Sequence, residues 1–190
     1  MWTDETFIGG HPALDFVNTV GDAAKSRADN RLTSPDSLLA WLAASGSKWE
    51  NLLPSLRDVE AVVQFRELTY QVLVATVENQ DASPEDRRQY ETLVKSAVGR
   101  ATLDASAAPA LWVATQDPAF HYVDRFVLLV EGFLRTPEVG KLRQCERCTW
   151  FFLNSGRGQG RRWCSMSTCG NRHKVAAHRE RRQADMPKTR

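Results

Sequence analysis

The sequence predicts an α+β protein, with a mostly helical first part that contains a few strands and a small second part that contains cysteines. Three observations lead to this prediction. Helix-start signals recur through the first part, apolar residues there repeat at helical spacing, and all four cysteines of the 190 residues lie after position 144. Because the residue before a proline is disfavoured in a helix, we place a boundary at Thr136-Pro137 and predict two domains, 1–136 and 137–190.

Several elements of the first part have local signatures. Ser34-Pro35-Asp36 and Ser83-Pro84-Glu85-Asp86 each put a capping serine before a proline and an acid, which is typical of a helix start. Phe7 to Val20 begins with a glycine-rich turn and predicts a short strand or the start of a helix. Apolar residues that recur at helical spacing predict the other helices. The predicted helices cover about 34–46, 56–78, 83–100 and 117–134, and one or two strands fall within 103–115.

The second part reads as a hairpin followed by a helix. We predict strands at 141–145, 150–153 and 161–164, with a glycine-rich loop at 154–160. A helix is predicted from about 169 to 183. In this reading, residues 161–164 form the returning strand of the hairpin.

Charge is divided unevenly along the chain. Residues 1–140 contain 12 Lys and Arg against 20 Asp and Glu, whereas residues 141–190 contain 13 against 3. An acidic body with a basic end favours a partner that carries phosphate, and the alternative is a solvated, disordered tail. The acidic start Met1–Glu5 does not resemble a secretory leader, and no apolar run reaches the roughly 20 residues of a membrane helix. We therefore expect a cytoplasmic protein without a membrane partner.

The cysteine spacing is C-x2-C-x15-C-x4-C, formed by Cys145, Cys148, Cys164 and Cys169. In a cytosolic protein this pattern favours a metal over disulfides. Four thiolates around one ion make a closed structural zinc site, and iron in the same sulfurs stays an alternative. The order of knuckle, hairpin and helix is that of a treble-clef zinc finger. A structural Zn²⁺ is the expected cofactor.

The basic residues around these cysteines are candidates for contacts with nucleic acid. We expect the hairpin arginines to bind phosphates and the helix to approach a groove, with its first residues near base edges. Asn171 has an equal alternative, a hydrogen bond to the backbone of the zinc knuckle between Cys145 and Cys148. The candidate residues are Arg157, Arg161, Arg162, Asn171, Arg172, His173, Lys174, Arg179, Arg181 and Arg182.

Two stretches resemble known families. Cys169-Gly170-Asn171-Arg172, preceded by Arg162-Trp163-Cys164 and Cys145-x-x-Cys148, resembles the CGNR zinc finger. Leu14-Asp15-Phe16-Val17-Asn18-Thr19 resembles the opening of the ABATE domain that precedes this finger. The resemblance implies a stress-induced bacterial transcription regulator whose four cysteines bind zinc and whose treble-clef-like finger binds DNA.

The first domain is expected to sense a ligand or to mediate assembly, for example as a homodimer. Asp15, Asn18 and Arg31 are candidates to line a small effector pocket, and the alternative is that Asp15 and Asn18 tie local backbone. The chain lacks a P-loop and a dinucleotide-binding glycine motif, so we expect no enzyme, although an enzyme-like first domain stays possible. A second alternative is a zinc-stabilised RNA-binding or ribosome-associated module.

Overall fold

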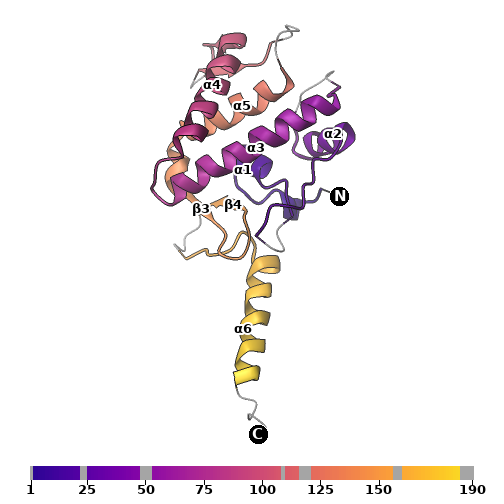
Figure 1. The fold of residues 1–190 in the computed structure, drawn as a ribbon, viewed down its shortest axis with the longest axis vertical. Coiled ribbons are helices and arrows are strands. Elements are labelled where there is room, and N and C mark those ends of the chain that lie inside the picture. Colours follow the sequence, from indigo (N-terminus) through magenta and orange to yellow (C-terminus); the bar gives the residue numbers. More distant parts are fainter. Residues whose placement is uncertain are drawn as a thin grey trace.

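The structure, a computed structural model, describes residues 2–21, 25–47, 53–107, 110–115, 121–155 and 160–184. A body of packed helices lies at one end, and a single basic helix projects from the other end (Figure 1). The helices of the body are α1 (Pro12–Val17), α2 (Pro35–Ala44), α3 (Leu56–Val77), α4 (Pro84–Arg100) and α5 (Tyr122–Leu134). The remaining elements are the 3₁₀ turns η1 (Asp4–Thr6) and η2 (Pro137–Lys141), the strands β1 (Thr102–Asp104), β2 (Leu111–Val113), β3 (Leu142–Gln144) and β4 (Phe151–Leu153), the π-helical turn η3 (Met166–Gly170), and α6 (Asn171–Ala184). The mostly helical α+β prediction is confirmed.

Capped helix starts lie where the sequence predicts them. The hydroxyl of Ser34 accepts a hydrogen bond from the N–H of Ser37 at 3.2 Å, and Ser83 accepts one from the N–H of Asp86 at 3.0 Å. Such caps satisfy amide groups that have no partner within the helix. The start predicted at Asp117 falls partly outside the described residues, and α5 is described from Tyr122.

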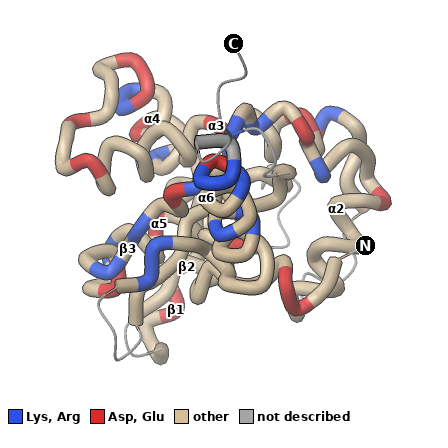
Figure 2. Tube along the Cα trace, turned by 90° about the horizontal axis from the view of Figure 1, so that it is seen from below, with Lys and Arg blue, Asp and Glu red and all other residues tan. Residues whose placement is uncertain are grey.

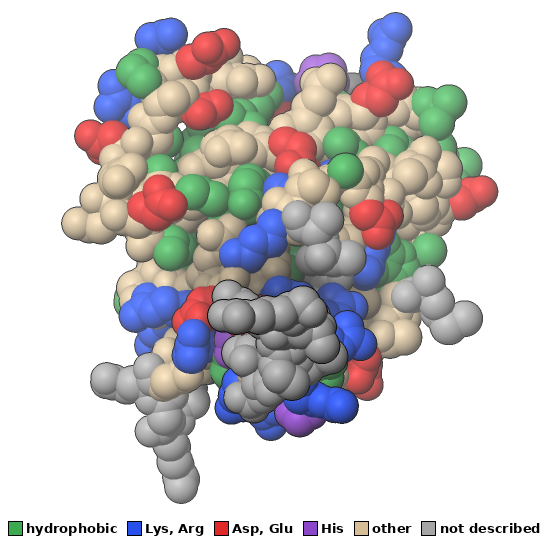
Figure 3. All heavy atoms as spheres, turned by 60° about the horizontal axis from the view of Figure 1, so that its bottom comes forward, with side chains coloured by type: hydrophobic (Ala, Val, Ile, Leu, Met, Phe, Trp, Pro, Cys, Tyr) green, Lys and Arg blue, Asp and Glu red, His purple; other side chains and the backbone are tan. Residues whose placement is uncertain are grey.

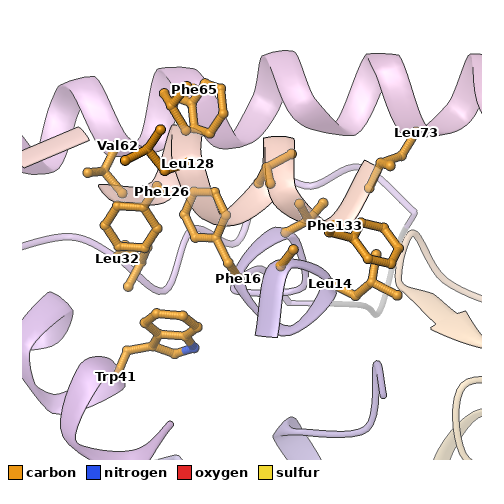
Figure 4. Close-up of a cluster of buried hydrophobic side chains, with 14 of the residues drawn as sticks. Leu14, Phe16, Leu32, Trp41, Val62, Phe65, Leu73, Phe126, Leu128 and Phe133 are labelled. Carbon is orange, nitrogen blue, oxygen red and sulfur yellow. The ribbon is translucent and has the colours of Figure 1, made fainter. Parts of the chain in front are cut away.

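Aromatic side chains from four helices fill the core of the body (Figure 4). Phe16 of α1 lies at the centre, with its ring centroid 4.4 Å from that of Phe126 on α5. The rings of Trp41 on α2 and Phe65 on α3 lie 6.1 and 6.3 Å from it. All four side chains are buried, so α1 is the element around which the longer helices pack.

The cysteine-bearing hairpin shares this core. Leu142, Phe151 and Leu153 belong to the same buried cluster as the helices of the body. The Phe151 ring lies 5.5 Å from that of Tyr70 on α3, and the N–H of Leu153 donates to the carbonyl of Gly9 at 2.8 Å. Apolar side chains therefore join the two predicted domains across their boundary.

Polar bonds at the end of α1 strengthen this junction. The side chain of Asn18 donates to the carbonyl of Phe151 at 2.9 Å and accepts from the N–H of the same residue at 2.8 Å. The indole N–H of Trp150 donates to the carbonyl of Val20 at 2.9 Å. Asn18 is 2% exposed, so no water replaces it as the partner of β4.

A buried arginine holds the chain that follows α1 against α3. Arg66 is 1% exposed, and its guanidinium donates to the carbonyl and hydroxyl of Thr19 and to the side chain of Asn30. Glu67 accepts from Arg66 at 2.8 Å and pairs with Arg27 at 2.6 Å. The charge of Arg66 is thus compensated inside the protein.

One local prediction is wrong, and the structure decides another that the sequence left open. Residues 161–164 form no strand; the hairpin is instead β3 paired antiparallel with β4, with the first cysteine pair in its turn. The backbone of 161–164 finds other partners, because the N–H of Glu146 and the side chain of Arg161 donate to its carbonyls. Phe7 to Val20, left open between strand and helix, contains helix α1, whose start His11 caps by accepting from Ala13.

Within the described residues, no helix combines the length and the apolar character needed to cross a bilayer.

Replacing Asn18 by alanine is expected to lower the free energy of unfolding by about 2–4 kcal/mol, because the N–H and the carbonyl of Phe151 lose their buried partner. Urea unfolding of the metal-loaded protein measures this change. Gln80→Ala, which removes an exposed amide, is the control and should change stability by less than about 0.5 kcal/mol. Equal effects of the two substitutions would contradict the role of Asn18.

Candidate metal centre and nucleic-acid interface

The four cysteines come from four separate places and meet at one point. Cys145 follows β3, Cys148 lies in the turn before β4, Cys164 follows the long loop, and Cys169 lies in η3. Their sulfur atoms all lie within 4.8 Å of one another, and each residue is at most 2% exposed. The chain thus gathers four soft ligand atoms in a buried cluster.

The distances within this cluster fit a tetrahedral zinc ion. The Sγ of Cys164 lies 3.6 Å from the Sγ of Cys148 and 3.6 Å from that of Cys169. Zinc–sulfur bonds of about 2.3 Å in a tetrahedron put the sulfurs about 3.8 Å apart, whereas a disulfide needs about 2.05 Å. The four cysteines are free of disulfides, and together they leave no open coordination position. Bound Zn²⁺ supplies a structural cross-link here.

Arg161 supports the metal centre from inside the finger. Its guanidinium donates to the carbonyl of Trp163 at 3.1 Å and to that of Cys164, and it lies 4.3 Å from the ring centroid of Phe152. Partial burial lowers the pKa of Arg161, and the charge of Cys164 opposes this effect. The structure therefore gives Arg161 partners within the protein, and its expected contact with phosphate stays a prediction.

Arg162 is exposed but paired. Its guanidinium binds both carboxylate oxygens of Glu146, at 2.7 and 2.5 Å, and this pairing lowers the pKa of Glu146. The same guanidinium lies 5.1 Å from the ring centroid of Trp163. Arg157, the third hairpin arginine of the prediction, lies outside the described residues.

Helix α6 carries the other predicted contacts into solvent. It continues directly from η3, so the turn that holds Cys169 also sets its direction. The structure buries none of residues 171–182 (Figure 1). Basic side chains gather around the projecting helix, while acidic ones are scattered over the body (Figures 2 and 3). Exposed on α6 are the predicted residues Asn171, Arg172, His173, Lys174, Arg179, Arg181 and Arg182.

Two residues at the start of α6 also have partners within the finger. The side chain of Asn171 donates to the carbonyl of Ser167, four residues earlier, at 3.1 Å, and not to the backbone of the Cys145–Cys148 knuckle as the alternative had it. The His173 ring lies 5.2 Å from that of Trp163. Neither contact buries the residue, so contact with bases stays a prediction for both.

The prediction missed Arg147, which lies between the first two cysteines. It helps to line an open hollow of about 450 Å³ at the foot of α6. Its backbone N–H donates to the Sγ of Cys145 at 3.4 Å. The sequence signal that could have identified Arg147 is its place inside the C-x2-C knuckle. Only the fold, however, shows that the knuckle lies beside α6. The polar lining of the hollow consists of Arg147, Ser167, Thr168, Asn171, Arg172 and Arg179.

Family models match both parts of the chain in the predicted order. Residues 10–136 match the ABATE model, which is described as "Putative stress-induced transcription regulator". The chain belongs to the ABATE family. Residues 141–182 match the CGNR zinc finger, and this range contains all four cysteines and most of α6. The ABATE domain is thus followed by a CGNR zinc finger with a clustered four-cysteine centre. No curated protein matches the chain.

Within the described residues, the candidate effector residues of the ABATE domain lie in different surroundings. Asp15 and Asn18 are buried, and Asp15 accepts from the N–H of Gly9 at 2.8 Å. Arg31 lies 5.7 Å from the ring centroid of Trp150 and lines a separate hollow of about 710 Å³. The contact of Asp15 agrees with the alternative in which it ties local backbone, whereas the side chain of Asn18 binds the backbone of Phe151, far along the chain. Binding of an effector at these residues stays a prediction.

Chelation of the metal is expected to destabilise the whole chain, because the hairpin that holds Cys145 and Cys148 shares the core of the ABATE domain. We expect one transition in far-ultraviolet circular dichroism, with Tm lowered by more than about 10 °C. Adding back Zn²⁺ should restore it. An unchanged helical transition after complete removal of the metal would show that the ABATE domain folds independently.

The stability of the protein is expected to fall as pH rises through the titration of Asp15. Burial raises the pKa of Asp15 from 3.8 to about 6, although the Gly9 hydrogen bond opposes this shift. Between these two pKa values the folded state therefore binds more protons than the unfolded state. This difference contributes about 3 kcal/mol to the free energy of unfolding at low pH. This contribution is present below pH 4 and is lost as pH rises through 6.

Asp15→Asn keeps the oxygen that accepts from Gly9 and removes the titration. The stability of this variant relative to wild type should therefore increase with pH across that window. Urea unfolding of both proteins at each pH measures the difference, and any loss of metal common to both cancels. A difference that does not change with pH would contradict the shifted pKa.

Proposed function

We propose that this protein is a DNA-binding transcription regulator whose helix α6 enters the major groove of duplex DNA. The observation that carries the proposal is the exposed, basic and projecting α6, held at its base by the four-cysteine centre. The family description as a transcription regulator supports it. In this role the protein has no substrate to turn over, and the metal is structural.

The dimensions of α6 favour DNA over RNA. Its 14 residues span about 21 Å, and a helix with side chains is about 10–12 Å across. The major groove of B-DNA is about 12 Å wide, whereas that of duplex RNA is too deep and narrow for side chains to read. An RNA-binding or ribosome-associated module is therefore the second candidate.

Charge lies on both flanks of the helix. At about 100° per residue, Arg172, Arg179 and Arg182 share one side of α6, while Lys174 and Arg181 share the other. A helix in the major groove has a phosphate backbone on each side. Two basic flanks suit this position better than a contact on one face alone.

We further propose that the ABATE domain controls the finger or brings two chains together. One short helix reads only a few base pairs, so a homodimer would supply the missing specificity. The route for control is the bond between Asn18 at the end of α1 and the backbone of Phe151 in the hairpin.

Fluorescence anisotropy of a labelled DNA duplex, measured against salt concentration, tests the proposal. We expect tight binding at low salt and loss of binding on chelation. A plot of the logarithm of the binding constant against the logarithm of the salt concentration should fall with a slope of about 0.9 for each phosphate contacted. Removing Lys174 and Arg181 together should lower the slope by about 1.8. The matched control removes Lys95 and Arg135, which are exposed on the body, and should leave the slope unchanged.

Absence of binding between the metal-loaded protein and duplex DNA at low salt would overturn the DNA proposal. Stronger competition by structured RNA than by duplex DNA would favour the second candidate. Equal slopes for the α6 variant and the body control would show that α6 is not the contacting element.

A further inference from the structure

The hollow at the foot of α6 collects positive charge from two separate elements. Arg147 comes from the knuckle between the first two cysteines, and Arg172 and Arg179 come from one side of α6. In the ion pairs of the described residues, neither Arg147 nor Arg179 has a carboxylate partner. Ser167 and Thr168 add hydroxyl groups to the same lining. Arginine and hydroxyl donors that converge on one hollow suit a phosphate group.

The position of Arg147 depends on the metal centre. Its own N–H donates to the Sγ of Cys145, and Cys148 follows it directly. Because two ligand residues flank the knuckle, bound metal holds the backbone of Arg147 in place. Cys169 of η3 holds the start of α6 in the same way. The two walls of the hollow are therefore held at a set separation by one ion.

The two acidic residues within 141–182, Glu146 and Glu180, do not line the hollow. Both carboxylate oxygens of Glu146 are bound by the guanidinium of Arg162, which also lies outside the lining. Around the helix axis, Glu180 lies about 80° from Arg172 and about 100° from Arg179. A phosphate beside these two arginines is therefore on a different side of α6 from the Glu180 carboxylate.

The lining of the hollow also contains an exposed apolar residue. Val175 is 50% exposed, and apart from it and the alanines the residues of α6 are polar. Around the helix, Asn171 and Val175 lie between the side of Arg172 and Arg179 and the side of Lys174 and Arg181. In a major groove this side would face base edges, where a valine methyl can contact the methyl group of thymine.

We propose that the hollow of Arg147, Arg172 and Arg179 holds one backbone phosphate of the bound nucleic acid and thereby sets the rotation of α6. With this phosphate in place, Val175 and Asn171 face the bases, and Glu180 on the opposite side of α6 faces away from them. The inference rests on the proposed function for the source of the phosphate. The chemistry of the site itself is the recognition of a phosphate diester.

The first experiment compares Arg147→Ala with Arg143→Ala in the salt dependence of binding to a labelled duplex. Both positions are exposed and lie in the same finger, but Arg143 donates to the carbonyl of Leu142 and does not line the hollow. Arg147→Ala is expected to lower the slope by about 0.9, which corresponds to one phosphate, and Arg143→Ala to leave it unchanged. Zinc content, measured for each variant, shows that the centre is intact.

The second experiment does not need DNA binding. Inorganic pyrophosphate is titrated into the ¹⁵N-labelled, metal-loaded protein while the side-chain Nε–H signals of arginine are followed. The Arg147 signal is assigned by its absence in Arg147→Ala. Saturable shifts of this signal are expected, with none for Arg143.

The two experiments separate the two proposals. DNA binding with an unchanged slope in Arg147→Ala overturns the phosphate site and leaves the DNA proposal intact. Absence of DNA binding together with pyrophosphate shifts at Arg147 overturns the DNA proposal and supports the site. Absence of both overturns both.

Discussion

The pairing of Asn18 with the backbone of Phe151 is the contact on which the arrangement of this protein depends. It satisfies both polar groups of a buried residue in β4, a place where water cannot substitute. Because α1 also carries Phe16 into the middle of the helical core, the same short helix connects that core to the hairpin. The position of the hairpin in turn sets where Cys145 and Cys148 lie.

The position of the projecting helix depends in turn on the metal centre, which connects it to the hairpin. Cys169 lies in η3, which runs directly into α6, so the four-cysteine cluster joins the packed body to a helix of which no residue from 171 to 182 is buried. A 14-residue helix with a strongly polar sequence is marginal by itself in water. Its attachment to the cluster gives it a defined start and direction.

The arginines of the finger serve different purposes because their surroundings differ. Arg161 binds carbonyl groups and an aromatic face within the finger, and Arg162 is neutralised by Glu146. Arg147, Arg179, Arg181 and Arg182 are exposed. Counting basic residues along the sequence therefore identifies the basic segment but does not separate the arginines that support the finger from the exposed ones.

Local signals in the sequence determined much of this protein. Serine caps, prolines and apolar periodicity depend on neighbours within about four residues, so they located most helices, and cysteine spacing identified the metal ligands. Only the tertiary structure decided that 161–164 forms no strand, that Asn18 binds β4, and that Arg147 meets α6. These three features depend on partners that are distant in the chain or on the direction of a turn. Such partners and directions leave no pattern among neighbouring residues of the sequence.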